Sequence, residues 1–245
     1  MVLQPGFSTD KEIVAPKPSE RTIRVLSFNV RLFDLYNWSD SEKTRQRIFS
    51  TIEQLKPDVI CFQEFFSSNH RNLDNISAIK NIAGMTHHHT EFSITMFLSD
   101  QYGLATFSKY PIIRKDIIKQ EKKTTNLAMY TDILIGSGDT LRIFNCHLQS
   151  VRFKAEDYAF IEDPVNNSNS SGKLSKTIAM LKLLKKAYSY RANQAEAIAK
   201  KISETTTPLW VCGDFNDTPI SFTYRTISEG LNDAFIEDGH GIGAT

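Results

Sequence analysis

The stretch WVCGDFNDTP at residues 210–219 places three polar side chains, Asp214, Asn216 and Asp217, directly after a short apolar run. The apolar residues suit a buried strand, whereas carboxylates and amides are costly to bury without partners. Two explanations fit this stretch alone: an ordinary polar turn, or a strand that delivers oxygen ligands to a site. The rest of the chain distinguishes between them.

Length and charge restrict the class of protein. The chain has 245 residues, enough for one large domain, and no Pro/Gly-rich linker divides it. We expect a polar, flexible linker at residues 1–22 and a single domain at 23–245. With 29 Lys and Arg against 28 Asp and Glu the net charge is +1, so the chain lacks a global basic field that would gather nucleic acid. A local basic groove stays possible.

The sequence contains no apolar run of the roughly 18 to 20 residues that a membrane-spanning helix requires. Residues 1–22 also lack the apolar centre of a signal peptide. The three cysteines, Cys61, Cys146 and Cys212, each lie in an apolar run without CxxC spacing, which predicts buried free thiols.

Periodicity predicts a layered domain of strands and helices. Short runs rich in β-branched, aromatic or other apolar residues predict strands at 23–28, 58–62, 103–108, 128–135, 141–146 and 209–212. Apolar residues at helical spacing predict helices at 41–55, with Ser41 as its start signal, and at 176–203. GSGD at 136–139 predicts a hairpin, so part of the sheet is antiparallel. These elements predict an α/β or α+β domain, with a mobile polar loop at 162–175.

Polar residues follow four of the predicted strands. One such ending would indicate turn chemistry, but four together indicate a site at one edge of the sheet. The residues are Asn29, Glu64, Asn145 with His147, and Asp214 with Asn216. Carboxylate and amide oxygens form a hard ligand set that suits Mg²⁺ or Mn²⁺ rather than zinc. A hard cation beside a histidine indicates phosphate chemistry.

Five segments, in order and spacing, resemble the endonuclease/exonuclease/phosphatase family, the deoxyribonuclease-like fold. They are LSFNVR (26–31), PDVICFQE (57–64), GLATFSKYPI (103–112), NCHLQS (145–150) and GDFNDTP (213–219). The resemblance extends from about residue 23 to the end of the chain. It implies a four-layer αββα sandwich of two mixed β-sheets, and hydrolysis of phosphate esters with Mg²⁺ or Mn²⁺ by in-line attack of an activated water.

The resemblance also implies roles for individual residues. Glu64 is similar to the family's principal metal ligand, with Asn29 as its neighbour at the metal. His147 resembles the histidine that contacts the scissile phosphate. Asp214 resembles the residue that orients or activates the water, with Asn216 beside it. Asp217 and Pro219 are expected to shape the following turn.

The family pattern continues to a later RxDxI strand and a closing SDH motif, and this sequence stops at GHGIGAT before either. Asp233 and His240 stand in the wrong context to replace those residues. The resemblance therefore predicts a C-terminally incomplete domain that lacks its last strands, either a shortened family member or part of a longer protein.

The branch of the family is indicated by few residues. The HL form of NCHLQSVR is similar to that of sphingomyelinases, inositol-phosphate phosphatases and deadenylases, and HLQSVR resembles the HLESTR of tyrosyl-DNA phosphodiesterases. That likeness would make Ser150 and Arg152 phosphate contacts. Asn126 is either a further substrate contact or a turn residue. The substrate could be a nucleic acid, a lipid or a small phosphate.

Two other segments have simpler explanations. THHHTEF at 86–92 is expected to be a solvated loop, because consecutive imidazoles cannot easily bind one ion. LKLLKKAYSYR at 181–191 has the pattern of an ordinary amphipathic surface helix, with Leu181, Leu184 and Tyr188 on one face.

The sequence thus predicts a metal-dependent phosphodiesterase or phosphatase. A nuclease of the same family and a non-catalytic binding module with the same fold are the alternatives. We expect a monomeric, soluble domain that is cytoplasmic or tethered to a membrane through a segment outside this sequence, as in a bacterial subgroup that LSFNVRLFDLYNW and CFQEFF resemble.

Overall fold

The computed structural model describes residues 22–39, 43–96, 99–119, 126–136, 138–151, 153, 157 and 170–238. Most of the predicted linker therefore lies outside the described residues. The same is true of Ser41, Arg152, His240 and positions 162–169 of the predicted loop.

Two mixed four-stranded sheets form the centre of the molecule. The first has the order β1-β2-β4-β3 and the second the order β5-β6-β7-β8. Each contains one parallel pair, β1 with β2 and β7 with β8, and its other pairs are antiparallel. The strands are β1 (Val25–Asn29), β2 (Val59–Ser67), β3 (His87–Met96), β4 (Asp100–Ser108), β5 (Ile112–Ile117), β6 (Ala128–Ile135), β7 (Asp139–His147) and β8 (Leu209–Asp214).

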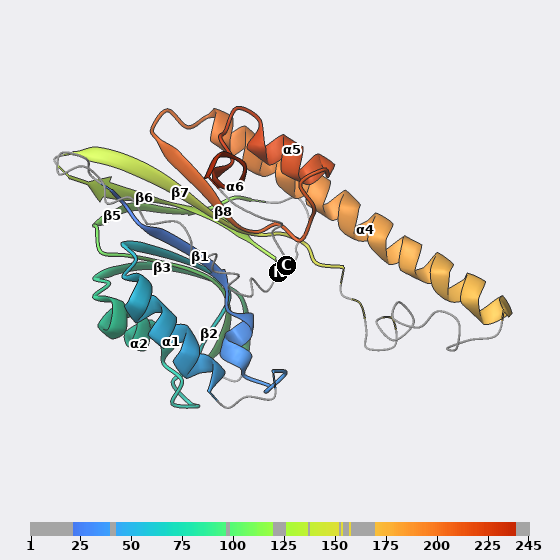
Figure 1. Ribbon diagram of the computed structural model, residues 1–245, viewed down its shortest axis with the longest axis horizontal. Helices are drawn as coiled ribbons and strands as arrows, with labels where there is room; N and C mark the ends of the chain where they lie inside the picture. The colour runs from blue at the N-terminus through green and yellow to red at the C-terminus, as the bar shows by residue number, and fades with distance from the viewer. Residues whose placement is uncertain are drawn as a thin grey trace.

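The helices cover the outer faces of the two sheets (Figure 1). Helices α1 (Thr44–Leu55) and α2 (Asn75–Ala83) cover the first sheet; α4 (Ser170–Ser203) and α5 (Phe222–Ser228) cover the second, with the short α6 (Ala234–Asp238) nearby. A one-turn 3-10 segment, η1 (Arg31–Asp34), follows β1. The predicted arrangement of two mixed sheets with helices is confirmed.

Three buried clusters correspond to the three contacts between layers. Ile48 and Ile52 of α1 pack on Phe62 and Phe65 of the first sheet. Ala195 and Ile198 of α4 pack on the second sheet. Between the sheets, Val59 and Cys61 of β2 meet Ile143 of β7 and Cys212 of β8. The two sheets therefore pack face to face, with the third cluster between them.

All six predicted strands are present, and β6 coincides with its prediction. Strands β3 and β5 were not predicted, because each is an edge strand with polar and exposed residues in its sequence. The interpretation of 86–92 as a solvated loop was wrong: these residues lead into β3, which pairs with β4, and His89 is buried.

Helix α1 ends at Leu55, before Pro57, as predicted; its C-cap residue Lys56 is left-handed with φ 46°. Helix α4 ends at Ser203 as predicted but begins at Ser170, so positions 170–175 are helical and not part of a loop. A glycine costs only about 1 kcal/mol relative to alanine in a helix interior, so Gly172 does not prevent a helix of 34 residues. Helices α2 and α5 were not predicted.

The cysteines are free thiols: Cys61 and Cys146 are buried and Cys212 is half-buried. Burial raises the pKa of the Cys146 thiol well above its ordinary value. Within the part of the chain that the structure describes, no helix is both long and apolar enough to cross a membrane.

Candidate active site

The two parallel strand pairs bring four predicted site residues to one edge of the sandwich. Asn29 ends β1, and Glu64 lies one residue past its partner on β2; His147 and Asp214 end β7 and β8 as register partners. Because the sheets pack face to face, these ends meet. The Asn29 amide Nδ2 donates to Asp214 Oδ2 at 2.8 Å, across the two sheets, and to Glu64 Oε1 at 3.3 Å.

A β-bulge aims the Glu64 side chain. Phe62 pairs with Ala105 but Phe65 pairs with Gly103, so β2 carries one extra residue at this point. Glu64 has φ 49°, a left-handed conformation that is strained for a residue with a side chain. The flanking residues of β2 are buried, whereas Glu64 is 35% exposed. The bulge turns this carboxylate out of the core and toward the site.

Gly213 allows the close contact between β7 and β8 that positions Asp214. Gly213 has φ +146°, and a Cβ at this position would lie 1.9 Å from the backbone oxygen of Cys146 on β7. Only glycine permits this approach of the two strands. Asp214 itself is buried, and both of its oxygens accept hydrogen bonds, one from Asn29 and one from the backbone N–H of Asn216 at 3.0 Å.

His147 faces Glu64, with 3.7 Å between Nε2 and the glutamate Oε1. Burial lowers the pKa of this imidazole, while the negative charges of Asp214 and Glu64 oppose the shift; the net direction is downward. The backbone N–H of His147 donates to the carbonyl of Leu127, which fixes the strand end. An imidazole next to carboxylates is able to donate or accept a proton.

Asn126 and Asn216 meet at the carbonyl of Leu148. Each donates its amide Nδ2 to this oxygen at 2.9 Å. Asn216 adopts φ 51°, which asparagine tolerates. Both side chains therefore hold the chain immediately after His147. Ser150 is half-buried three residues beyond His147, and within the described residues its hydroxyl makes no hydrogen bond to the other predicted site residues.

Asn145 is not part of the site, although it was among the polar strand endings. It is fully buried between the sheets, where it accepts from Gln63 Nε2 at 2.7 Å and donates to the carbonyls of Phe62 and Ala105. Its hydrogen bonds connect β7 of the second sheet to β2 and β4 of the first sheet.

Arg191 on α4 is a supporting residue that the sequence did not indicate. Its side chain is 2% exposed and pairs with the equally buried Asp217 at 2.9 Å, while Nη1 donates to the carbonyl of Gln149 at 2.9 Å. Gln194 accepts from the Gln149 N–H. Helix α4 thus fixes the segments after β7 and β8. Asp217 shapes its turn as expected, through its bond from the Thr218 N–H.

Arg31 is a second residue that the sequence did not indicate. Residues 31–34 are all left-handed, with φ between 44° and 60°, and buried Phe33 anchors the segment in the core. The Arg31 N–H donates to Asn29 Oδ1 at 3.0 Å. Its exposed guanidinium lies 4.8 Å from the centre of the ring of exposed Trp38, which is in tilted contact with the ring of Tyr36. Backbone strain of this kind is often found at functional sites.

The donor set suits an open magnesium site. Within the described ranges, no three His, Cys, Asp or Glu side chains form a cage for a metal. Mg²⁺, however, commonly uses one or two carboxylates together with waters and substrate phosphates. Glu64 is the exposed carboxylate that could serve such a site. Asn29 directs its amide nitrogen at the carboxylates and its oxygen at Arg31, so it orients Glu64 and Asp214 in this structure.

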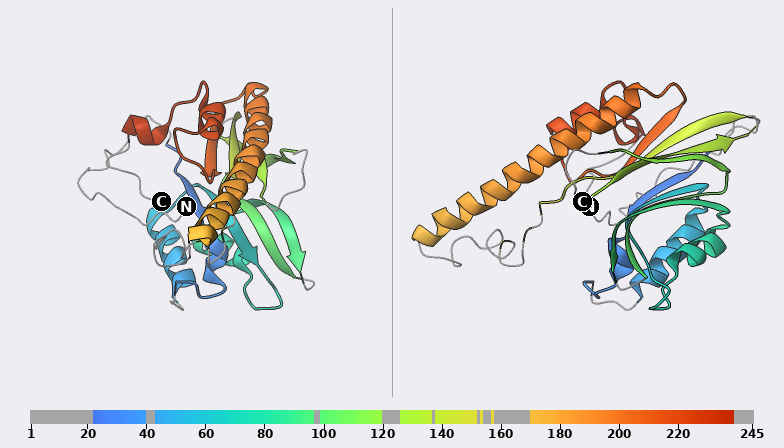
Figure 2. Two further views of the ribbon diagram at one scale, coloured as in Figure 1. Left: turned by 90° about the vertical axis from the view of Figure 1, so that its right-hand side faces the viewer. Right: turned by 180° about the vertical axis from the view of Figure 1, so that it is seen from behind.

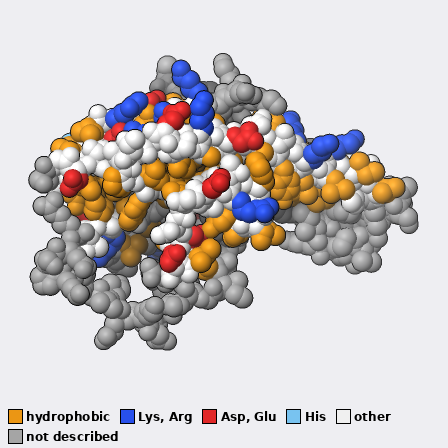
Figure 3. All heavy atoms as spheres, turned by 90° about the horizontal axis from the view of Figure 1, so that it is seen from above, with side chains coloured by type: hydrophobic (Ala, Val, Ile, Leu, Met, Phe, Trp, Pro, Cys, Tyr) orange, Lys and Arg blue, Asp and Glu red, His pale blue; other side chains and the backbone are white. Residues whose placement is uncertain are grey.

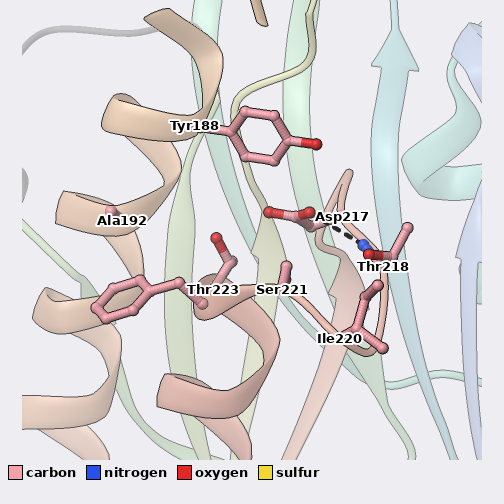
Figure 4. Close-up of a pocket in the computed structure, with 8 residues that line it drawn as sticks. Tyr188, Ala192, Asp217, Thr218, Ile220, Ser221 and Thr223 are labelled. Carbon is pink, nitrogen blue, oxygen red and sulfur yellow. Dashed lines mark hydrogen bonds between the residues drawn. The ribbon is translucent and has the colours of Figure 1, made fainter. Parts of the chain in front are cut away.

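A pocket of about 400 Å³ opens beside these residues. In Figure 4, Tyr188 and Ala192 of α4 face the segment between β8 and α5 across this pocket. The segment contributes Asp217, Thr218 and Ile220, directly after the strand that carries Asp214. The lining of the pocket follows Asp214 along the chain but does not include Asn29, Glu64, His147 or Asp214.

Comparison with known proteins shows the family of the chain. Residues 26–245 match the model of the endonuclease/exonuclease/phosphatase family. Comparison with curated protein sequences gives no match.

Solved structures share the fold at low identity. Sphingomyelinase C from Streptomyces griseocarneus is 18% identical, with 86% of this chain and 70% of that one covered and a TM-score of 0.54. The human Nocturnin catalytic domain is 17% identical, with 84% and 69% covered and a TM-score of 0.57. A humanized D. rerio TDP2 is 17% identical, with 86% and 72% covered and a TM-score of 0.53. This chain belongs to the endonuclease/exonuclease/phosphatase family of phosphoesterase hydrolases.

Proposed function

We propose that the chain is a divalent-metal-dependent hydrolase of phosphate esters, a phosphodiesterase or phosphatase. The observation that carries the proposal is the bridge from Asn29 to Glu64 and Asp214, with His147 3.7 Å from Glu64. Strand ends from both sheets contribute, so the cluster exists only because the sheets pack together. An ordinary polar turn would not require this cross-sheet connection.

Each residue has a distinct role in the proposed reaction. Glu64 would hold Mg²⁺ or Mn²⁺, which when bound neutralises the phosphate oxygens. Asp214, held by Asn29 and the Asn216 N–H, orients a water and accepts its proton as the water attacks phosphorus in line with the leaving oxygen. His147 contacts the phosphate and stabilises its increasing negative charge. Asn126 and Asn216 position the backbone after His147.

A nuclease is the second candidate. Two exposed aromatic rings, Tyr36 and Trp38, lie in tilted contact beside Arg31, whose N–H contacts Asn29. Aromatic rings with an arginine provide a surface on which nucleobases stack. This pair favours a nucleic-acid substrate. The net charge of the whole chain, +1, does not favour one.

The proposal is tested by hydrolysis of bis-p-nitrophenyl phosphate with Mg²⁺, with Mn²⁺ and with chelator. The chain is compared with its Glu64→Ala and Asp214→Ala variants, and with Glu53→Ala as a control because Glu53 is exposed on α1. We expect metal-dependent turnover that both site variants lose and the control keeps. Single-stranded and duplex oligonucleotides test the nuclease. A folded chain that is inactive on all of these substrates would support the binding module instead.

A further inference from the structure

The amino-terminal half of α4 projects beyond the body of the molecule (Figures 1 and 2). We call residues 174–186 the α4 arm. Every residue of the arm is exposed except Met180 and Leu184, which are half-buried, and Ala187 is the first fully buried residue of the described part of the helix. The segment is a surface helix as predicted, but Leu181 and Tyr188 on its apolar face are exposed rather than packed on the protein.

An apolar stripe lies along the arm. Leu174, Ile178, Leu181 and Tyr188 follow helical spacing and share one face. Their side chains are 65%, 43%, 58% and 49% exposed. Lys185 lies on the same face, between Leu181 and Tyr188. Single exposed apolar residues are common on proteins, but several along one helix face indicate an interaction surface.

The arm is also strongly basic. Lys176, Lys182, Lys185 and Lys186 are all exposed, and the sequence has no Asp or Glu between Asp163 and Glu196. Because the whole chain carries a net charge of only +1, this concentration of positive charge is local. Figure 3 shows Lys and Arg side chains directly beside hydrophobic side chains on the projecting part of the molecule.

The stripe continues to the pocket beside the site. Tyr188 and Ala192 line the pocket, together with Ile220 and Phe222, which are 84% and 52% exposed. Arg191 fixes the helix to the segments after β7 and β8. From this anchor the helix extends about 25 Å to Leu174, at 1.5 Å per residue. The apolar and basic surface thus starts at the pocket between α4 and the segment after β8 and leads away from it.

We infer that the α4 arm docks on the surface of an anionic lipid bilayer. A helix with an aliphatic row beside lysines lies in the interface, with the apolar side chains among the acyl chains and the ammonium groups at the anionic headgroups. A second copy of the chain would bring two sets of four lysines together, and nucleic acid would leave the leucines and isoleucine without partners. This inference is independent of the proposed hydrolysis, since it concerns binding alone.

The test is co-sedimentation of the chain with vesicles of phosphatidylcholine alone and of phosphatidylcholine with 30% phosphatidylserine. One variant carries Leu174→Gln, Ile178→Gln and Leu181→Gln, and another carries Lys182→Gln, Lys185→Gln and Lys186→Gln. A charge-matched control carries Lys43→Gln, Lys56→Gln and Lys115→Gln, at exposed positions elsewhere. All substituted side chains are exposed, so thermal unfolding should be unchanged and serves as the check on folding.

We expect binding to the anionic vesicles, little binding to phosphatidylcholine alone, and loss of binding in the apolar variant. The lysine variant should bind roughly 100-fold more weakly, because each lysine near an anionic surface contributes about fivefold. The control should bind like the original chain. Absence of binding, equal binding to both vesicles, or binding that both arm variants retain would overturn the inference. So would a dimer in solution that the apolar variant dissociates, or tighter binding of duplex DNA that competes with the vesicles.

Discussion

The side-chain amide of Asn29 donates a 2.8 Å hydrogen bond to the carboxylate of Asp214, which lies 185 residues later and on the other sheet. Asp214 is buried, and Asn29 also donates to Glu64. One neutral amide therefore separates two carboxylates that would otherwise repel each other. This contact joins the two sheets at the edge where the site lies.

Replacing Asn29 should affect stability as well as activity. Asn29→Ala leaves the buried Asp214 without one donor, so the free energy of unfolding should fall by about 1–3 kcal/mol. Asn29→Asp should lower it further at pH 7.5, because a third carboxylate adds repulsion. That excess loss should shrink toward pH 4, because the neighbouring carboxylates raise the pKa of the introduced carboxyl and it protonates first. Urea unfolding at both pH values measures this. Asn193→Ala, at an exposed position on α4, is the control. Equal stability of the Asp and Ala variants at pH 7.5 would contradict the electrostatic explanation.

The left-handed backbone of Glu64 should lower the stability of the fold, while its carboxylate is needed for activity. Its φ of 49° is strained for any residue with a Cβ, so Glu64→Gly should be more stable than Glu64→Ala by about 1 kcal/mol. Both variants should lose metal-dependent activity. Urea denaturation with the phosphodiester assay measures the two effects. If the Gly and Ala variants unfold at the same urea concentration, the bulge is not strained.

Gly213→Ala should be among the most damaging single substitutions. The added Cβ would meet the Cys146 oxygen at 1.9 Å, which forces β7 and β8 apart and moves Asp214. We expect a loss of about 3 kcal/mol or more in the free energy of unfolding, which is large for a point mutation. Gly138→Ala is the matched control, because Gly138 has a similar φ of +132° and nothing within 4 Å of the new Cβ. A loss of similar size in the control would show that the backbone angle, rather than the clash, is responsible.

The buried pair of Arg191 and Asp217 should show strong coupling. Arg191→Met or Asp217→Leu alone leaves a buried charge without its partner and should cost about 3–5 kcal/mol. The double variant should lose much less than the sum of the two. A double-mutant cycle of unfolding free energies measures the coupling, and additive losses would argue against a direct interaction. The double variant should still have a lower kcat, since the carbonyl of Gln149 loses its donor.

His89 should make the fold sensitive to acid. Burial lowers the pKa of this imidazole below its ordinary value of 6.5, although the hydrogen bond to Glu91 opposes the shift. The pKa of His89 is lower in the folded protein than in the unfolded chain. Neutral His89 therefore contributes its full stabilisation of the folded state above pH 6.5, and this contribution is lost as the pH falls toward the folded-state pKa. His89→Gln should flatten the decline in unfolding free energy between pH 7 and pH 5.5. His70→Gln, at an exposed position, should leave the slope unchanged.

Much of the candidate site followed from sequence. Asn29, Glu64, His147 and Asp214 were predicted because polar residues ended four apolar runs, and parallel strand pairs bring such ends to one edge. The pattern could not separate Asn145 from His147, because the two residues are two apart on β7 and share one face of the strand. Only the packing of the sheets shows that Asn145 is buried against Gln63 while His147, at the end of the strand, faces Glu64. Strands β3 and β5 were missed since edge strands tolerate polar residues.

The sequence by itself determined which side chains share a face, because the 3.6-residue period of a helix and the two-residue period of a strand depend only on local geometry. Only the tertiary structure decided what covers each face. Along α4 the same apolar periodicity continues from Leu174 to Ile202, yet Ala195 and Ile198 pack on the second sheet while Leu174 and Leu181 remain exposed. Likewise the sequence of α4 gave no sign that Arg191 is buried, because its partner, Asp217, is 26 residues away and meets it only when the layers assemble.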